Sequence, residues 1–550
     1  MALAVSCGKD NIVDISVDDS NDYVENISFD RTIYVVYSTS GDAVVTGASA
    51  DFDVAIDGNG VTIKNGGDEK VIYDLSGTAT DGFFKVYSSQ PQQIMLNDVS
   101  LSNPLGAAIN VQGPSSAPSS GKRTYVVVSG SNSLADGSSY SKTPTGEDEK
   151  AALFSEGIML ISGSGSLSVS ATGKTAIASD GYLRILDAPS LTLSSTAGHG
   201  MRGKKKLIVS GGTLTVNVSA NTKKGITSPG PVTVDGGVTS ITVSGSAAYD
   251  SDDADYSGTA GVKAGGDFTM KGGELTVVNS GTGGKGISGD AAALFSGGKV
   301  SVTVTGSNYN SGGISAKGIK FDGPISITDG SVTVSAAKHE GIESKSTITI
   351  SGGVVYSYSA SDDAINSASD FTISGGVVCG HSAGNDGLDA NGNLYVKGGV
   401  IYAIGASQPE EALDANTEGG YKLYVQGGTL IAIGGLESGA SLSQNCYSAS
   451  WSSSTLYGMT VGSTSYAFKT PSSAGSTLVV SGSSSPTLKS AVTVSGGTEY
   501  FSSSQTPLTV GCTVSGGSTV TLSSYTGGGG NQGGGPGGGP GGGPGGGPGH

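Results

Sequence analysis

Short stretches in which apolar and polar residues alternate recur along most of this chain. One of them, Val400–Ile404, follows directly on the glycine pair Gly398 and Gly399. Alternation with a period of two places successive side chains on opposite faces of a strand, so one face enters the core. The glycine pair allows a sharp turn because glycine adopts positive φ without a steric penalty. The pattern predicts an all-β protein built from short strands and glycine turns.

Residues 317–435 repeat at a nearly fixed interval. Each repeat begins with a small residue between charged or amide neighbours, as in Lys317–Lys320 and Glu340–Glu343. The small residues are spaced by 23, 23, 23 and 25 positions and are Gly318, Gly341, Ala364, Gly387 and Ala412. A fixed period of this size with little helical signal is typical of stacked repeats. The sequence therefore predicts a right-handed parallel β-helix, a solenoid, with irregular N-terminal coils and a small C-terminal β region.

Stacked coils place equivalent residues in columns about 4.8 Å apart. The column expected to face inward consists of Val355, Val378, Ile401 and Leu430. The neighbouring outward column consists of Tyr356, Cys379, Tyr402 and Ile431. Tyr356 and Tyr402 are candidates for stacking on sugar rings. The alternative is an apolar stripe that the chain after residue 435 covers.

Two further columns are acidic. The column before the small residue contains Glu340, Asp363, Asp386 and Glu411, and the column three residues later contains Glu343, Asn366, Asp389 and Asp414. Like charges this close repel one another unless a cation neutralises them, and oxygen-only ligands suit Ca²⁺. These eight residues, with Asp362, are the predicted Ca²⁺ ligands. The alternative is an acidic edge whose side chains extend into water.

In the preceding coils the same two columns are largely basic. They contain His199, Lys224, Lys285 and Lys317 in one column and Arg202, Lys263 and Lys320 in the other. Ammonium groups bind carboxylates, so Lys285, Lys317 and Lys320 are predicted to bind the uronates of an acidic polysaccharide. The alternative is charge balance on an exposed edge.

The repeats and composition changes predict five segments. These are a lipoprotein-like N-terminus and tether (1–22), N-terminal β coils (23–150), the β-helix (151–435), a C-terminal β domain or cap (436–526) and a Gly/Pro tail (527–550). Two longer intervals between corner glycines predict loops that bulge from the body, at 247–258 and 307–313.

Charge and cysteine content limit the possible partners and location. The chain has 550 residues, 94 of them glycine, and a net charge of −17, which argues against nucleic-acid binding. It has no apolar run long enough to cross a membrane. Cys7 lies in a segment that resembles the lipobox of bacterial lipoproteins, so we expect lipidation at Cys7 and an extracellular or cell-surface location, with an outer-membrane lipoprotein as one option. A disulfide between Cys446 and Cys512 suits an exported protein, with Cys379 left over or pairing with one of them.

Several stretches together resemble a known family. They are Ser131–Gly137 with Tyr140, Lys150–Ser155, Ile161–Leu167, the later glycine coils and the ending Ser523–Gly528. The chain resembles the bacterial carbohydrate-binding β-helix proteins first recognised in a cellulolytic clostridium. That resemblance implies a parallel β-helix that binds calcium and cell-wall polysaccharides such as cellulose or polygalacturonate.

These features predict a monomeric, non-catalytic protein that binds pectic or cellulosic polysaccharide with the help of Ca²⁺. One alternative is a calcium-dependent pectate lyase, because Lys320 is expected one coil from Glu343. No lyase motif, nucleophile elbow or histidine cluster supports that alternative. The other alternative is a structural spacer or adhesin, and the ordered acidic columns argue against it.

Overall fold

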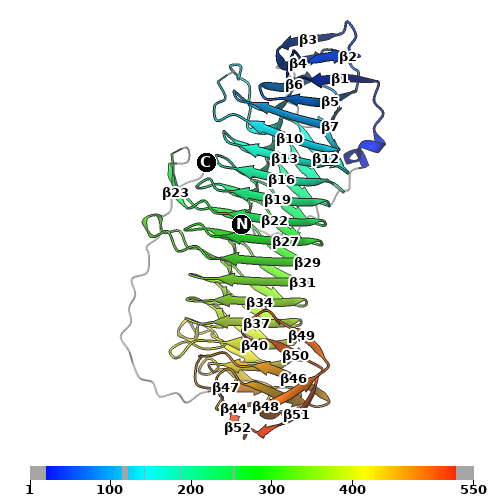
Figure 1. The fold of residues 1–550 in the computed structure, drawn as a ribbon. Coiled ribbons are helices and arrows are strands. Elements are labelled where there is room, and N and C mark those ends of the chain that lie inside the picture. The colour runs from blue at the N-terminus through cyan, green and yellow to red at the C-terminus, as the bar shows by residue number, and fades with distance from the viewer. Residues whose placement is uncertain (1–19, 114–121, 142, 188, 252–253, 528–550) are drawn as a thin grey trace, which may run out of the picture.

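The protein is an elongated stack of turns, each built from short strands, as a computed structural model shows (Figure 1). The structure describes residues 20–113, 122–141, 143–187, 189–251 and 254–527. Cys7, most of the predicted tether and nearly all of the Gly/Pro tail lie outside these residues. Among the described residues, no helix has the length and apolar character needed to span a membrane. The short 3-10 helices are η1 (Ser20–Asp22), η2 (Val24–Asn26), η3 (Asn310–Gly312) and η4 (Thr417–Gly419).

One wall of the stack is a sheet of 14 strands. Its strands are parallel except for the first pair. In order they are β3 (Phe52–Asp57), β4 (Asn59–Asn65), β6 (Gly82–Ser88), β8 (Ile109–Gln112), β11 (Ala151–Ser155), β14 (Thr175–Ser179), β17 (Met201–Gly203), β20 (Lys224–Ser228), β25 (Ala260–Ala264), β28 (Lys285–Gly289), β30 (Ile319–Phe321), β32 (Ile342–Ser344), β35 (Ile365–Ser367) and β38 (Leu388–Ala390).

The remaining walls belong to a sheet of 30 strands. Its first half comprises β1 (Arg31–Tyr37), β2 (Val44–Thr46), β5 (Val71–Ala79), β7 (Gln92–Asn103), β9 (Arg123–Ser129), β10 (Ser131–Asp136), β12 (Ile158–Gly163), β13 (Ser166–Ala171), β15 (Tyr182–Ile185), β16 (Ser190–Ser195), β18 (Lys206–Val209), β19 (Thr213–Val218), β21 (Val232–Val234), β22 (Val238–Val243) and β26 (Phe268–Met270). Its second half comprises β27 (Glu274–Asn279), β29 (Ala293–Val304), β31 (Ile325–Ala336), β33 (Ile348–Ile350), β34 (Val354–Ser359), β36 (Phe371–Ile373), β37 (Val377–Ser382), β39 (Leu394–Val396), β40 (Val400–Ile404), β41 (Leu423–Val425), β42 (Thr429–Ile433), β43 (Ser441–Leu442), β44 (Cys446–Ala449), β47 (Leu478–Ser481) and β52 (Ser523–Tyr525).

The predicted fold class, a right-handed parallel β-helix, is wrong. The protein is all-β as expected, but its walls form a closed body around one core. Long strands join the outer walls into one sheet. β29 pairs with β26, β27 and β31, and β31 pairs with β33 and β34 as well. Antiparallel strands are added at both ends, β3 on β4 and β47 on β42. The 23-residue period indicates only that turns stack. It does not specify where a strand continues around a corner, nor which strands cover the first and last turns.

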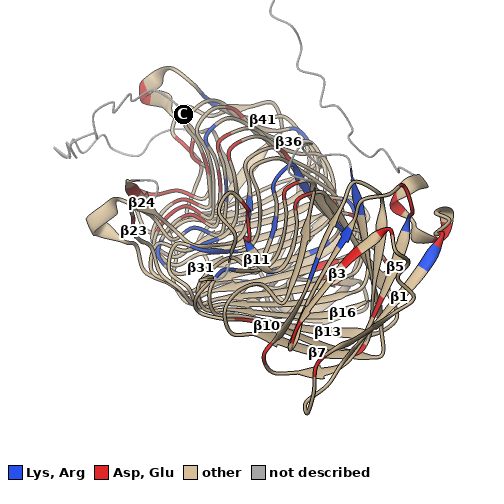
Figure 2. Cartoon of the chain, turned by 90° about the horizontal axis from the view of Figure 1, so that it is seen from above, with Lys and Arg blue, Asp and Glu red and all other residues tan. Residues whose placement is uncertain are grey.

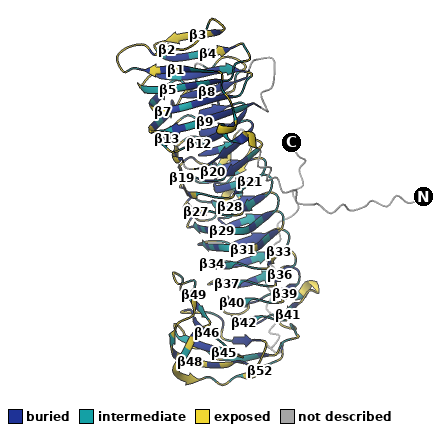
Figure 3. Cartoon of the chain, turned by 90° about the vertical axis from the view of Figure 1, so that its right-hand side faces the viewer, coloured by how far each residue is buried: buried dark blue, intermediate teal, exposed yellow. Residues whose placement is uncertain are grey.

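The core runs along the whole stack (Figure 3). The predicted inward column is confirmed, because Val355, Val378, Ile401 and Leu430 are all fully buried and in register. The two predicted loops also leave the body. The first contains the hairpin β23 (Ala248–Asp250) and β24 (Asp255–Ser257), and the second contains η3. The predicted segment boundaries stay predictions.

A six-stranded antiparallel sheet lies against the C-terminal turns (Figure 1). Its strands are β45 (Leu456–Val461), β46 (Thr464–Lys469), β48 (Thr487–Ser495), β49 (Thr498–Tyr500), β50 (Leu508–Val510) and β51 (Thr513–Thr519). It packs on the column of Tyr356, Cys379, Tyr402 and Ile431. The stripe is therefore covered by the chain after residue 435, which is the alternative that the sequence left open.

The predicted disulfide does not form, because Cys379, Cys446 and Cys512 are all free and buried. The Cys446 thiol donates to the Gln444 carbonyl oxygen at 3.5 Å, and the Cys512 thiol donates to the Ser465 carbonyl oxygen at 3.7 Å. Cys446 lies in β44 of the 30-stranded sheet, whereas Cys512 lies between β50 and β51 of the six-stranded sheet.

Tyr402 ties the C-terminal sheet to the stack. Its side chain is fully buried, its hydroxyl donates to the Lys469 carbonyl oxygen at 2.7 Å, and its ring centroid lies 5.5 Å from that of Phe468. We expect Tyr402→Ala to lower the free energy of unfolding by about 3–5 kcal/mol, because it leaves a cavity between the two sheets. The control Tyr402→Phe removes only the hydrogen bond and should cost about 1 kcal/mol. Denaturant unfolding measures both, and equal losses would contradict the assigned packing.

Candidate functional site

The predicted charged columns lie along one edge of the 14-stranded sheet. Adjacent strands pair Lys320 with Glu343, Glu343 with Asn366 and Asn366 with Asp389. Viewed down the stack, acidic segments of successive turns gather at one corner (Figure 2). The stacking of these residues is therefore as the period predicted, while their roles as ligands stay predictions.

Tight turns hold this edge together. The amide of Gly318 donates to the Glu340 carbonyl oxygen, and the same bond links Gly341 to Asp363 one turn later. A Cβ added at Gly318 would lie 2.3 Å from the Gly341 carbonyl oxygen, so successive turns approach too closely for a side chain there. This close approach explains why the repeats begin with small residues.

The first acidic turn is already neutralised. The Lys317 ammonium lies 3.1 Å from Glu340 and 2.5 Å from Glu343, and all three side chains are buried. Lys345 adds a further ion pair to Glu343. Lys317 was predicted to bind sugar, but its contacts make it the internal counter-ion of this turn. Glu340 and Glu343, predicted as Ca²⁺ ligands, therefore have a protein cation instead.

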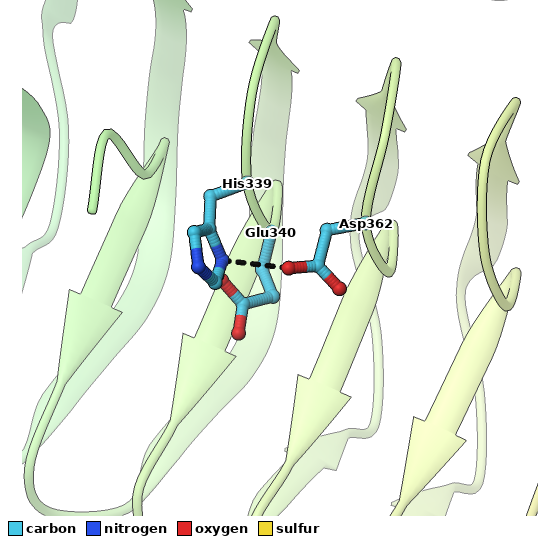
Figure 4. Close-up of side chains that lie close together, drawn as sticks. All are labelled: His339, Glu340 and Asp362. Carbon is cyan, nitrogen blue, oxygen red and sulfur yellow. Dashed lines mark hydrogen bonds and ion pairs between the residues drawn. The ribbon is translucent and has the colours of Figure 1, made fainter. Parts of the chain in front are cut away.

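A histidine that the sequence analysis did not assign completes the same turn (Figure 4). The imidazole Nδ1 of His339 forms a hydrogen bond with the Glu340 carboxylate and lies 2.7 Å from Asp362 Oδ2. Burial lowers the pKa of His339, but hydrogen bonds in which the carboxylates of Asp362 and Glu340 accept from the imidazole outweigh burial and raise that pKa to about 9. One ligand atom from each of these residues lies within 4.8 Å of the others, a grouping with the size of a metal site. A protonated imidazole supplies positive charge to the two carboxylates of this group. The signal in the sequence was the position of His339 one turn before Asp362.

The later turns have no such neutralisation. In the described part of the chain, no basic side chain forms an ion pair with Asp363, Asp386, Asp389, Glu411 or Asp414. Burial, followed by neighbouring carboxylates, raises the pKa of Asp386 to about 9 and that of Asp389 to about 8. Burial outweighs the hydrogen bond from Asn366 and raises the pKa of Asp363 to about 7. These groups repel one another when ionised.

Two acids near the end of this edge extend the group. Burial and the neighbouring Asp414 raise the pKa of Glu411 to about 8, and its buried Oε2 has no hydrogen-bond partner among the residues that the structure describes. The pKa of Glu437 is raised by burial and by Asp414. Glu437 lies after the last repeat, so the repeat pattern did not reveal it.

Part of each acidic side chain also supports the backbone. Asp363 Oδ1 accepts a hydrogen bond from the Asp386 amide at 3.1 Å, and Asp386 Oδ1 accepts one from the Glu411 amide at 2.5 Å. Asn366 donates to the other oxygen of Asp363 at 2.8 Å. One oxygen of Asp386 thus fixes the next turn, and its second oxygen has no hydrogen bond to another described residue.

The basic end of the edge offers one unpaired ammonium. Burial, followed by repulsion from Lys320, Lys317 and further lysines, lowers the pKa of Lys285 to about 8. Among the described residues, the Lys285 side chain has no hydrogen-bond or ion-pair partner. Lys320 instead forms an ion pair with Asp322. Of the three lysines predicted to bind sugar, only Lys285 has an ammonium free for an anion.

The two tyrosines predicted to stack on sugar rings do not face solvent. Tyr402 is fully buried and Tyr356 is 7% exposed, both under the C-terminal sheet. The prediction of sugar stacking by Tyr356 and Tyr402 is therefore wrong. Alternation identifies the two faces of a strand, but it does not reveal that a second sheet covers the outer face.

Comparisons with known proteins show one family. A family model described as "Carbohydrate-binding domain-containing protein" matches residues 57–229 and 191–364, which together make more than half of the chain. No curated protein matches. A solved structure described as the polysaccharide lyase-like protein from C. thermocellum, gadolinium derivative, is 18% identical. That match covers 50% of this chain and 95% of the other with a TM-score of 0.32, which does not establish a common fold.

Proposed function

The chain belongs to the family of carbohydrate-binding domain-containing proteins, and we propose on that premise that it binds cell-wall polysaccharide without cleaving it. In this proposal Ca²⁺ occupies the later acidic turns of the edge. The single observation that carries the calcium proposal is the set of stacked carboxylates that have no basic partner in the described chain. Export and lipidation at Cys7 would place this edge outside the cell.

The chemistry of the later turns suits Ca²⁺. Asp386, Asp389, Glu411 and Asp414 offer oxygen atoms only, and Ca²⁺ takes six to eight oxygen ligands in flexible geometry. A divalent cation would remove the repulsion that raises their pKa values and would keep them ionised. The first turn fits a metal less well, because Lys317 and His339 already supply positive charge there.

An acidic polysaccharide suits the same edge. The unpaired ammonium of Lys285 can bind a uronate carboxylate. Bound Ca²⁺ can also bridge a protein carboxylate to a uronate. Lys285 and Asp386 lie four turns apart, which is about 19 Å at the strand spacing, so one extended chain of several sugar units can reach both.

The same separation favours binding over lyase chemistry. A lyase base must lie beside both the metal and the proton that it removes. Lys317 is engaged with Glu343 and Lys320 with Asp322, so neither offers a free amine. Lys285 has a lowered pKa, which suits a base, but it lies far from the unpaired carboxylates.

We expect the protein to be retained on insoluble polygalacturonate in Ca²⁺ and released by EDTA. The pair Asp386→Asn and Asp389→Asn should abolish retention, and Lys285→Met should weaken it about tenfold, because a charged hydrogen bond to the ligand is lost. Asp42→Asn, exposed at the far end of the stack, is the matched control and should bind normally.

Absorbance of unsaturated uronate in the supernatant is followed in the same assay. Its growth with time would replace the binding proposal by a lyase. Retention that EDTA does not change would overturn the calcium proposal and leave the binding proposal in place. No retention in either buffer would overturn the uronate assignment.

A further inference from the structure

A groove of about 530 Å³ lies on a different face of the molecule, away from the charged edge. Its floor is the outer face of β29, β31 and β34, and its wall is the loop of residues 501–505 between β49 and β50. The strands of its floor lie beside the turns against which the C-terminal sheet is packed (Figure 1). None of the predicted Ca²⁺ ligands or lysines lines it.

The lining of the groove is polar but uncharged. Hydroxyl groups of Ser301, Thr303, Ser331, Thr333 and Ser335 form the floor, and Gln505 adds an amide. No Asp, Glu, Lys, Arg or His is among the lining residues. A charged ligand would therefore lose its hydration without gaining an opposite charge, whereas a neutral polyol would find donors and acceptors.

Aromatic rings close one end of the groove. Tyr358 and Phe501 are half-buried there, beside the buried Tyr356. The ring centroids of Tyr356 and Phe501 lie 5.4 Å apart at an angle of 38°. A flat apolar ring face beside hydroxyl groups suits a sugar ring, which has an apolar C–H face and a hydroxylated rim.

The wall loop is fixed in an unusual conformation. Phe501 has φ of 60°, which is rare for a bulky residue, and the Ser504 amide donates to its carbonyl oxygen at 2.8 Å. The Thr506 amide donates to Ser504 Oγ at 3.1 Å. Residues with strained backbone conformations cluster at active sites and ligand-binding sites, and they persist only where the surrounding structure holds them in place.

The floor continues beyond the groove as a track of hydroxyl groups. One column in register runs Thr192, Thr215, Ser240, Thr276, Ser301 and Thr333, and it ends at Tyr356. The column is exposed on β16, β22 and β27 and partly buried on β19, β29 and β31. A chain lying along this column would reach the aromatic wall at its end.

We propose that this groove is a second glycan-binding site and takes an uncharged chain of hexoses. Its aromatic wall packs against one sugar face while the Ser and Thr hydroxyls bind the rim. The inference rests on the carbohydrate-binding function proposed above but uses none of the same residues. It also requires no Ca²⁺.

Titration calorimetry with cellohexaose, mannohexaose and hexagalacturonate in EDTA tests the site. We expect a neutral hexaose to bind and hexagalacturonate not to bind. Thr333→Val keeps the shape of the side chain but removes the hydroxyl, and should weaken binding about fivefold. Tyr358→Leu keeps apolar packing but removes the ring, and should weaken binding at least about tenfold.

Thr349→Val is the matched control, because it removes an exposed hydroxyl on β33, outside both the groove and the track, and should leave the affinity unchanged. Thermal unfolding of each variant shows whether the fold is intact. No binding of either neutral hexaose, or equal affinity in the Thr333 and Thr349 variants, would overturn the groove assignment. The polygalacturonate assay depends on the charged edge, whereas the calorimetry depends on the groove. The two proposals can therefore fail separately.

Discussion

Replacing Lys317 with methionine is expected to lower the free energy of unfolding by about 3–5 kcal/mol. The substitution keeps the length of the side chain but leaves Glu340 and Glu343 without the ammonium that contacts both. Both carboxylates are at most 5% exposed, so they cannot recover their hydration. Removing one partner of a buried ion pair costs this much because a buried charge remains uncompensated. Denaturant unfolding at neutral pH measures the loss.

Two further variants separate charge from packing. Lys320→Met removes a lysine of the same edge whose partner, Asp322, is largely exposed, and should cost at most about 1 kcal/mol. Combining Lys317→Met with Glu340→Gln and Glu343→Gln removes the uncompensated charges, so most of the lost stability should return. A Lys317 variant as stable as the wild type would show that this ion-pair cluster does not stabilise the fold.

The calcium-free protein is expected to unfold at progressively lower temperature as the pH rises from 5 to 9. In the unfolded chain, carboxyl groups release their protons near pH 4. In the folded chain, burial raises the pKa of Asp363 to about 7 and that of Asp386 to about 9. Between these pH values the folded state binds more protons than the unfolded state, so stability falls as the pH rises. Each such group contributes about 1.4 kcal/mol per pH unit within its window.

His339 adds to the same trend. Its pKa in the folded protein is raised to about 9, so the stability that its charged form contributes is present below about pH 6.5 and is lost as the pH approaches 9. Saturating Ca²⁺ should flatten the profile above pH 7 if it occupies the later acidic turns. Thermal unfolding in EDTA and in Ca²⁺, measured across this pH range, gives both profiles.

The control for this prediction replaces Asp386 and Asp389 with asparagine. That variant should lose most of the pH dependence, should be more stable than the wild type at pH 8 in EDTA, and should not respond to Ca²⁺. Stability of the wild type that rises between pH 5 and 9 would show that these carboxyl groups stay ionised in the folded chain.

The stacking of the charged columns could be predicted because it depends on a local repeat. The small residues at Gly318 and Gly341 recur because a Cβ at either position would lie 2.3 or 2.6 Å from a carbonyl oxygen of the next turn. Once that period is known, the pairing of Lys320 with Glu343 and of Asn366 with Asp389 follows from strand geometry. The position of each acid along the edge therefore needed no tertiary information.

The direction in which the pKa of each acid shifts could not be predicted in the same way. Glu343 and Asp389 occupy the same column, yet the pKa of Glu343 is lowered and that of Asp389 is raised. Although burial favours the neutral form of both, Lys317 and Lys345 outweigh it at Glu343, whereas burial and nearby carboxylates raise the pKa of Asp389. Whether a lysine side chain turns inward depends on the space and charge around it, which the repeat does not encode.

The sequence by itself determined that this protein is all-β, that its turns stack with a 23-residue period, and that acids follow lysines along one edge. These properties depend on alternation and on glycine turns, which act over a few residues. Only the tertiary structure decided that the walls close around one core, that Tyr356 and Tyr402 are covered, that Cys446 and Cys512 stay apart, and that an uncharged groove forms beside the 501–505 loop. Each of these depends on contacts between segments more than 60 residues apart or on the corners between walls, and no local pattern specifies which distant surface will pack there.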